Sequence, residues 1–173
     1  MRINCSRCRT AEYTVTLTAV DPASVDLEPG ALCATTSFVD CLLVKVVVEP
    51  GDMLLAATAA RILQRVATET SAAITVIDGF ARRTKASGIT RDYRRCPAAD
   101  TVEVLTELAE RLEERGNFVH LVPSGWNKSW EAEPFEYAGA QRVVDLTVGD
   151  EPVIWSAADI SGWSSRCGRL FRP

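Results

Sequence analysis

Short apolar runs alternate along the chain with two segments of helical periodicity. The strand pattern is clearest where apolar residues are continuous or alternate with polar ones. Strands are predicted at Tyr13–Thr18, Cys41–Val48, Ala73–Ile77, Phe118–Val122, Phe135–Tyr137, Arg142–Leu146 and Val153–Trp155. Those at 41–48 and 73–77 contain few polar residues and are expected to be buried.

The first helix is predicted over 52–68, after Pro50-Gly51, with Asp52 as its N-cap. Its apolar residues recur at helical spacing: Leu54, Leu55, Ala59, Ile62, Leu63 and Val66. The second helix is predicted over 101–115, with Asp100 as N-cap, Glu103 at the capping-box position and Gly116 as the stop. Its inner stripe is Val104, Leu105, Leu108 and Leu112, and its glutamates form a solvated face.

The order β-α-β-α-β in the middle of the chain predicts an α/β layer with right-handed crossovers. An N-terminal hairpin precedes it. The pattern weakens after about residue 147, so residues 1–147 are expected to form one domain and residues 148–173 a C-terminal extension.

Composition and charge narrow the class of protein. The chain has 173 residues, of which 47% are hydrophobic and 24% charged, which indicates a globular protein. The net charge of −4 excludes a wholly basic nucleic-acid coat but allows a local basic patch. The first residues lack the apolar core of a signal peptide, and no apolar run reaches the ~20 residues of a membrane span. We expect a cytoplasmic protein with neither a membrane nor DNA as partner.

A basic segment lies between the predicted strand at 73–77 and the second helix. Residues 79–95 hold six basic residues and one acid. The basic residues are Arg82, Arg83, Lys85, Arg91, Arg94 and Arg95. On an acidic protein such a segment suits a nucleic-acid backbone, and Tyr93 suits stacking on an unpaired base. The alternative is a solvated loop with no ligand.

The segment 123–130 combines turn residues with a lysine between two tryptophans, Trp126 and Trp130. A lysine in this position is expected to be partly buried, which suits it to polarise a carbonyl or to orient a water. The alternative is a hairpin with an exposed lysine and two packing tryptophans.

The six cysteines and the single histidine give weaker signals. Cys5-x-x-Cys8 supplies half of a zinc site or a redox pair, but no second close pair completes it. Free thiols are the simpler interpretation, and no metal is expected. His120 lies in an apolar run and is interpreted as structural.

Three segments together resemble a known family. They are Ile74-Thr-Val-Ile-Asp-Gly-Phe-Ala81, a helix ending in Leu112-Glu-Glu-Arg-Gly116, and Phe118 to Trp130 with its Pro-x-Gly-x-x-Lys block. The stretch from residue 1 to about 147 resembles the N-terminal editing domain of archaeal-type threonyl-tRNA synthetases. The resemblance implies a fold like that of D-aminoacyl-tRNA deacylases, a homodimer, and hydrolysis of a seryl ester at the 3′ end of threonine tRNA without a cofactor.

The resemblance also implies residue roles. Lys128 would act on the ester and water as the catalytic lysine, and Gln141 stands where the family has a catalytic glutamate. The backbone at Lys45, Val46 and Val47 would line the amino-acid pocket. Other substrate contacts are implied for Phe80, Ala81, Arg82, Trp126, Asn127 and Cys8. Contacts with tRNA are expected from Arg83, Lys85, Arg91, Arg94 and Arg95.

Departures from the family pattern leave the activity open. Gln141 cannot take a proton from water, so a base role is lost there unless Glu131, Glu133 or Glu136 substitutes. Arg82 replaces the family's histidine, and Lys45 replaces an apolar residue. Three functions remain: a trans-acting deacylase, an aminoacyl-tRNA-dependent acyl transferase, and a non-catalytic module that binds aminoacyl-tRNA or a synthetase.

Overall fold

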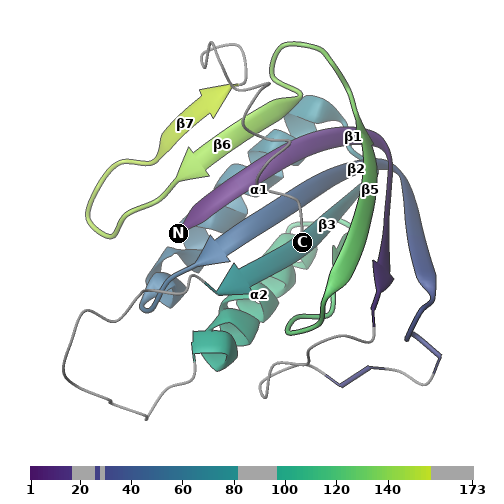
Figure 1. Ribbon diagram of the computed structural model, residues 1–173. Coiled ribbons are helices and arrows are strands. Elements are labelled where there is room, and N and C mark those ends of the chain that lie inside the picture. The colour runs from purple at the N-terminus through teal and green to yellow at the C-terminus, as the bar shows by residue number, and fades with distance from the viewer. Residues whose placement is uncertain (17–25, 28–29, 82–96, 157–173) are drawn as a thin grey trace.

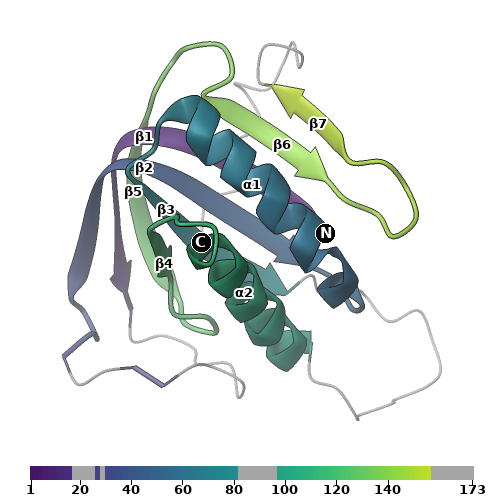
Figure 2. The same ribbon diagram turned by 180° about the vertical axis from the view of Figure 1, so that it is seen from behind.

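The computed structural model describes residues 1–16, 26–27, 30–81 and 97–156, with the side chains of 97–99 excepted. Seven strands form one sheet in the order β4-β3-β2-β1-β6-β7, and β5 also pairs with β1. The strands are β1 (Arg2–Val15), β2 (Thr35–Val48), β3 (Ile74–Ala81), β4 (Val119–Leu121), β5 (Lys128–Pro134), β6 (Gln141–Asp145) and β7 (Val153–Ser156). Figure 1 views the face that the helices leave open, and Figure 2 shows both helices on the other face.

The central connections confirm the predicted α/β layer. A 3-10 turn (Asp52–Leu55) and α1 (Ala56–Thr70) lead from β2 to β3, and α2 (Pro97–Glu113) lies between β3 and β4. β2 pairs with β3 in parallel, as β3 does with β4, while β1 and β2 form the antiparallel N-terminal pair. None of the helices in the described part of the chain is long and apolar enough to cross a membrane.

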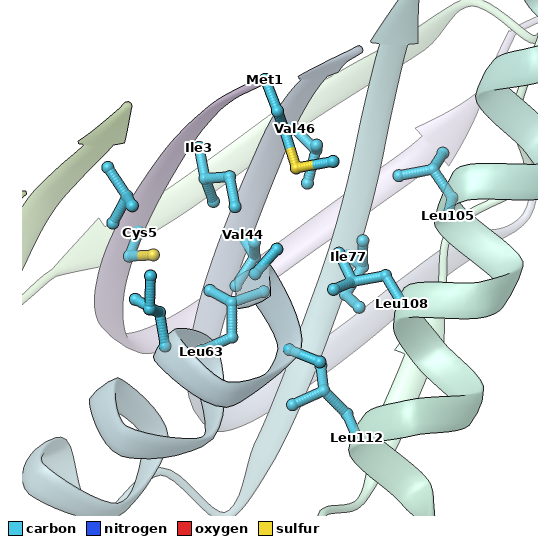
Figure 3. Close-up of a cluster of buried hydrophobic side chains, with 14 of the residues drawn as sticks. Met1, Ile3, Cys5, Val44, Val46, Leu63, Ile77, Leu105, Leu108 and Leu112 are labelled. Atoms are coloured by element: carbon cyan, nitrogen blue, oxygen red, sulfur yellow. The ribbon is translucent and has the colours of Figure 1, made fainter. Parts of the chain in front are cut away.

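An apolar core fills the space between the helices and the sheet (Figure 3). Leu63 of α1 and Leu105, Leu108 and Leu112 of α2 are completely buried. They meet strand residues that alternate toward the helices, such as Val44, Val46 and Ile77. The predicted inner stripe of the second helix is therefore confirmed.

Gly79 of β3 allows α2 to lie close to the sheet. A Cβ at this position would lie 2.2 Å from Cδ1 of Leu105, inside any normal contact distance. A larger residue would push α2 away. The glycine therefore matters for packing on the helix-covered face, although it directly follows Asp78 on the other face.

The beginnings of both helices differ from the predictions. Asp52 does not cap a helix: its carboxylate accepts hydrogen bonds from the Met1 ammonium (3.1 Å) and the Glu49 N–H (2.7 Å). The Asp52 carboxylate is therefore engaged by the chain's N-terminus and by a local turn, and it does not cap the helix. Asp100 lies in the first turn of α2 instead of at its N-cap, because α2 begins at Pro97. Leu54, predicted to face inward, is 76% exposed because the 3-10 turn breaks the helical phase.

The strand predictions need two corrections. Phe135–Tyr137 is not a strand: the strand in this region is β5, which ends at Pro134. The predicted strand at 13–18 is the end of a longer one, β1, and residues 17–18 lie outside the described residues. The start of the predicted C-terminal extension contributes β7, which pairs antiparallel with β6.

Candidate functional site

A second cluster of side chains occupies the open face of the sheet. It joins the second half of β1 to β2, β3 and Val122, which directly follows β4, and β5 bends over it (Figure 1). Its members include Cys8, Tyr13, Phe38, Cys41, Leu43 and Val76, with Trp126 and Trp130 packed against them. The predicted functional residues that the structure describes lie mostly within or beside this cluster.

Asp78 and Lys128 form a buried ion pair beside this cluster. The Lys128 Nζ lies 2.7 Å from Oδ1 of Asp78, and the exposed fractions of the two side chains are 4% and 0%. The same ammonium donates a hydrogen bond of 2.8 Å to the carbonyl of Pro123. The ion pair joins the start of β5 to the middle of β3 and holds the ammonium in one place.

The Asp78 carboxylate depends on this ion pair. Neither of its oxygens has a hydrogen-bond partner of good geometry among the described residues, although Nζ of Lys128 is close to one of them. A buried carboxylate without hydrogen bonds needs a nearby positive charge to remain ionised. The arrangement is therefore held by charge more than by directed hydrogen bonds.

Lys45 adds a second positive charge. It is the direct partner of Asp78 in the parallel pairing of β2 with β3. Burial lowers the pKa of Lys45, Asp78 opposes that shift, and the neighbouring Lys128 adds to it. Its Nζ lies 5.1 Å from the centre of the Trp130 ring. Two lysines thus share one buried carboxylate, which leaves a surplus of positive charge when both are protonated.

Several other predicted residues lie around this group. The Nζ of Lys128 lies 5.9 Å from the centre of the Phe80 ring, which is 43% exposed, and Ala81 ends the same strand. Trp126 packs against the cluster. The carbonyl of the exposed Asn127 accepts a hydrogen bond of 2.9 Å from the Thr16 N–H.

The strand β2 divides its residues between the two faces. The side chain of Val46 is buried in the helix-covered core, so only its backbone can take part in a site on the open face. Val47 alternates with it and is half-buried beside Lys45. Cys8 is close enough to Lys45 for the two groups to influence each other electrostatically.

Gln141 lies on β6, which β1 separates from the strand β2 that carries Lys45. It pairs with Ser6 on β1, whereas Lys128 pairs with Val15 at the far end of that strand. The strand register gives no contact between Gln141 and Lys128, and the catalytic role of the two residues stays a prediction.

The glutamates considered as substitutes for Gln141 do not fill that role. Glu131 and Glu133 alternate with Trp130 on β5 and so face the opposite side of the strand. Glu133 forms an ion pair of 2.9 Å with Arg9, and Glu136 is exposed beyond the end of β5. A surface hollow of about 340 Å³ is lined by Glu131, Glu133, Glu12, Thr10 and Ala132, an acidic lining that suits a nucleic-acid end poorly.

The substrate contact predicted for Arg82 and the tRNA contacts predicted for Arg83, Lys85, Arg91, Arg94 and Arg95 lie outside the described residues. They follow Ala81 directly in the sequence, at the end of the strand that carries Asp78 and Phe80. Their roles stay predictions.

Asp78 is the residue that sequence reasoning missed. Its signal was a single acid in the otherwise uncharged strand from Ile74 to Ala81. A charge at such a position is rare unless it is paired, and Lys45, between the valines of β2, carries the same signal. The two signals become informative only when the strand register places them side by side.

Comparisons with known proteins do not identify a family for this chain. A scan against protein-family models finds no match, and a search of curated proteins finds none of significance. The inference of function therefore rests on the residues themselves.

Proposed function

We propose that this protein is an aminoacyl-tRNA deacylase that acts in trans in the cytoplasm and hydrolyses a misacylated, seryl-type ester at the 3′ end of a tRNA. The observation that carries the proposal is the Lys128 ammonium, held by Asp78 and the Pro123 carbonyl, with Lys45 beside it. A deacylase-like fold and a homodimer, implied by the resemblance, belong to the same proposal.

A fixed ammonium suits ester hydrolysis because negative charge develops on the carbonyl oxygen as water adds. Water forms a bond to the carbonyl carbon, the bond from that carbon to the ribose oxygen breaks, and the ribose oxygen takes the proton that water loses. A donor already in position stabilises the intermediate oxyanion without first having to reorganise. Donors of this kind contribute about 3–4 kcal/mol in well-studied acyl-transfer sites.

The surplus positive charge beside Asp78 also suits the substrate. The 3′ end of a bound tRNA would bring phosphates toward Lys45 and Lys128, which offset part of their charge. The basic segment at 82–95 continues from β3 and would extend this attraction along the RNA. Phe80 and Trp130 provide apolar surface beside the two ammonium groups.

The test is deacylation of seryl-, threonyl- and alanyl-tRNA by the purified protein. Lys128→Ala by itself leaves Asp78 buried without its partner, so loss of activity there is ambiguous. The double variant Lys128→Met with Asp78→Asn removes both charges and is expected to fold while losing at least tenfold in rate. Arg111→Met, which breaks an ion pair with Glu107 on α2, is the matched control and is expected to keep full activity.

The proposal is supported if the wild type and Arg111→Met hydrolyse one of the esters and the folded double variant does not. Full activity in that variant shows that the ion pair is structural and overturns the role of Lys128. Binding of an aminoacyl-tRNA without hydrolysis overturns the deacylase proposal and favours the acyl transferase or the non-catalytic module.

A further inference from the structure

The strand pairing brings together two thiols that are far apart in the sequence. Cys8 of β1 and Cys41 of β2 are direct cross-strand partners in the antiparallel ladder. Both are free thiols, both are completely buried, and both belong to the cluster on the open face. Neither lies in the core under the helices.

The distance between directly opposed residues suits a disulfide. Opposed Cα atoms in antiparallel strands lie about 4.5 or 5.5 Å apart, and disulfides span Cα separations of about 4.4–6.8 Å. The two thiols are close enough for each to shift the pKa of the other, and the Cys8 thiol also donates a hydrogen bond of 3.5 Å to the carbonyl of Ser6. No large backbone movement is needed to join the sulfurs.

Arg7 holds the two cysteines in this register. Its buried guanidinium donates from one nitrogen to the carbonyls of both Cys8 (3.1 Å) and Cys41 (3.3 Å). It also donates to the carbonyls of Thr70 and Ser71 at the end of α1 and forms an ion pair with Asp40. One side chain thus connects the backbones of both cysteines to the rest of the fold.

We propose that Cys8 and Cys41 are a redox-sensitive dithiol that a small peroxide, such as hydrogen peroxide, converts to a cross-strand disulfide. The inference does not depend on the proposed function. It replaces the pairing that the Cys5-x-x-Cys8 spacing suggested, because Cys5 faces the helix-covered core and Cys8 faces the opposite side of the sheet.

The chemistry assigns different roles to the two sulfurs. The neighbouring Cys8 thiol lowers the pKa of Cys41, and the nearby Arg7 charge acts in the same direction. The neighbouring Cys41 thiol and burial raise the pKa of Cys8. Cys41, as thiolate, attacks one peroxide oxygen and becomes a sulfenic acid as water leaves. The Cys8 sulfur then displaces a second water, so two thiols and one peroxide give one disulfide and two waters.

The test uses the full chain with Cys5, Cys33, Cys96 and Cys167 replaced by serine, so that only the proposed pair remains. The matched control keeps Cys5 and Cys41 and replaces Cys8 together with the other three cysteines. Cys5 is on the same strand as Cys8 and is buried to the same degree, but it faces away from Cys41. Each folded protein is treated with hydrogen peroxide, and the free thiols are counted after denaturation together with the intact mass.

We expect the Cys8/Cys41 protein to lose both thiols and two hydrogens in mass, and to regain both thiols with dithiothreitol. The Cys5/Cys41 control is expected to keep its thiols under the same treatment. Two observations would overturn the proposal. The first is that both thiols of the folded Cys8/Cys41 protein persist under peroxide conditions that oxidise the exposed Cys33 of the wild type. The second is that the Cys8/Cys41 protein and the Cys5/Cys41 control form a disulfide to the same extent. Circular dichroism of each variant establishes that the protein tested is folded.

Discussion

The two faces of the sheet are built on different physical principles. The face beneath α1 and α2 is apolar, and its strand residues are mainly valine, isoleucine and leucine (Figure 3). The open face, on the same strands, carries a buried ion pair, a second lysine, two thiols and, against Tyr13 and Phe38, the protein's only histidine. Adjacent residues of β3 show the contrast: Asp78 faces one way and Gly79 the other.

This difference separates stability from chemistry. Apolar burial under the helices stabilises the fold without requiring directed partners. Buried charge on the open face costs free energy unless each group has a partner, and such groups are retained where they serve a purpose. Substitutions on the two faces are therefore expected to act through different mechanisms, which the following measurements separate.

The largest effect is expected from Asp78→Asn. It leaves the Lys128 ammonium buried without a counter-ion, and breaking such pairs costs about 3–5 kcal/mol of unfolding free energy. Urea denaturation measures this loss. Lys128→Met in the same background is expected to restore part of it, because the buried Lys128 charge is then removed while Lys45 still lacks the carboxylate. A single-variant cost below about 1 kcal/mol would show that the pair is not effectively buried.

A smaller effect is expected on the other face from Gly79→Ala. The added Cβ overlaps Leu105, which is completely buried and has no open space to move into, so the cost is about 1–3 kcal/mol. Combining it with Leu105→Ala tests the mechanism: in that background the alanine at 79 is expected to cost almost nothing. Equal costs in both backgrounds would contradict steric overlap as the cause.

The smallest effect is expected from the titration of His120. Burial lowers the pKa of His120 in the folded protein below the 6.5 of an exposed histidine, and the ring lies 3.0 Å from the Tyr13 hydroxyl. The unfolded chain therefore binds the proton more readily. The contribution of neutral His120 to the free energy of unfolding is therefore complete above about pH 6.5 and is lost as the pH falls below that value. The free energy of unfolding is expected to fall by less than ~1.4 kcal/mol per pH unit.

Urea midpoints between pH 7.5 and pH 5 measure this slope, with His120→Gln as the reference. The difference between the two proteins is expected to grow as the pH falls. An unchanged difference across this range would mean that His120 does not titrate differently in the folded state.

The interiors of the helices and strands were easier to predict from the sequence than their ends. The inner stripe of α2 and the buried strand from Cys41 to Val48 were confirmed, because long periodic patterns are set by which side must be buried. The ends of the elements were less predictable. Asp52 had the chemistry of an N-cap, but the Met1 ammonium and the Glu49 N–H, which no local pattern reveals, take its carboxylate instead.

The candidate site was predictable only in part. Lys128 was selected from its place between two tryptophans and from the family resemblance, and Lys45 from the resemblance alone. The partner of Lys128 was not found, because Asp78 is 50 positions earlier in the chain and its strand looks like an ordinary buried strand. The role predicted for Gln141 stays a prediction, since the strand register pairs it with Ser6 and Lys128 with Val15.

The sequence by itself determined the α/β class, the two amphipathic helices and the presence of unusual charges within apolar strands, since these depend on local periodicity and composition. Only the tertiary structure decided which residues meet. The register of β2 against β3 placed Lys45 beside Asp78, the bend of β5 brought Lys128 to the same carboxylate, and the register of β1 against β2 paired Cys8 with Cys41 instead of Cys5. Register and strand order depend on packing across the whole sheet, so no local segment of the chain contains that information.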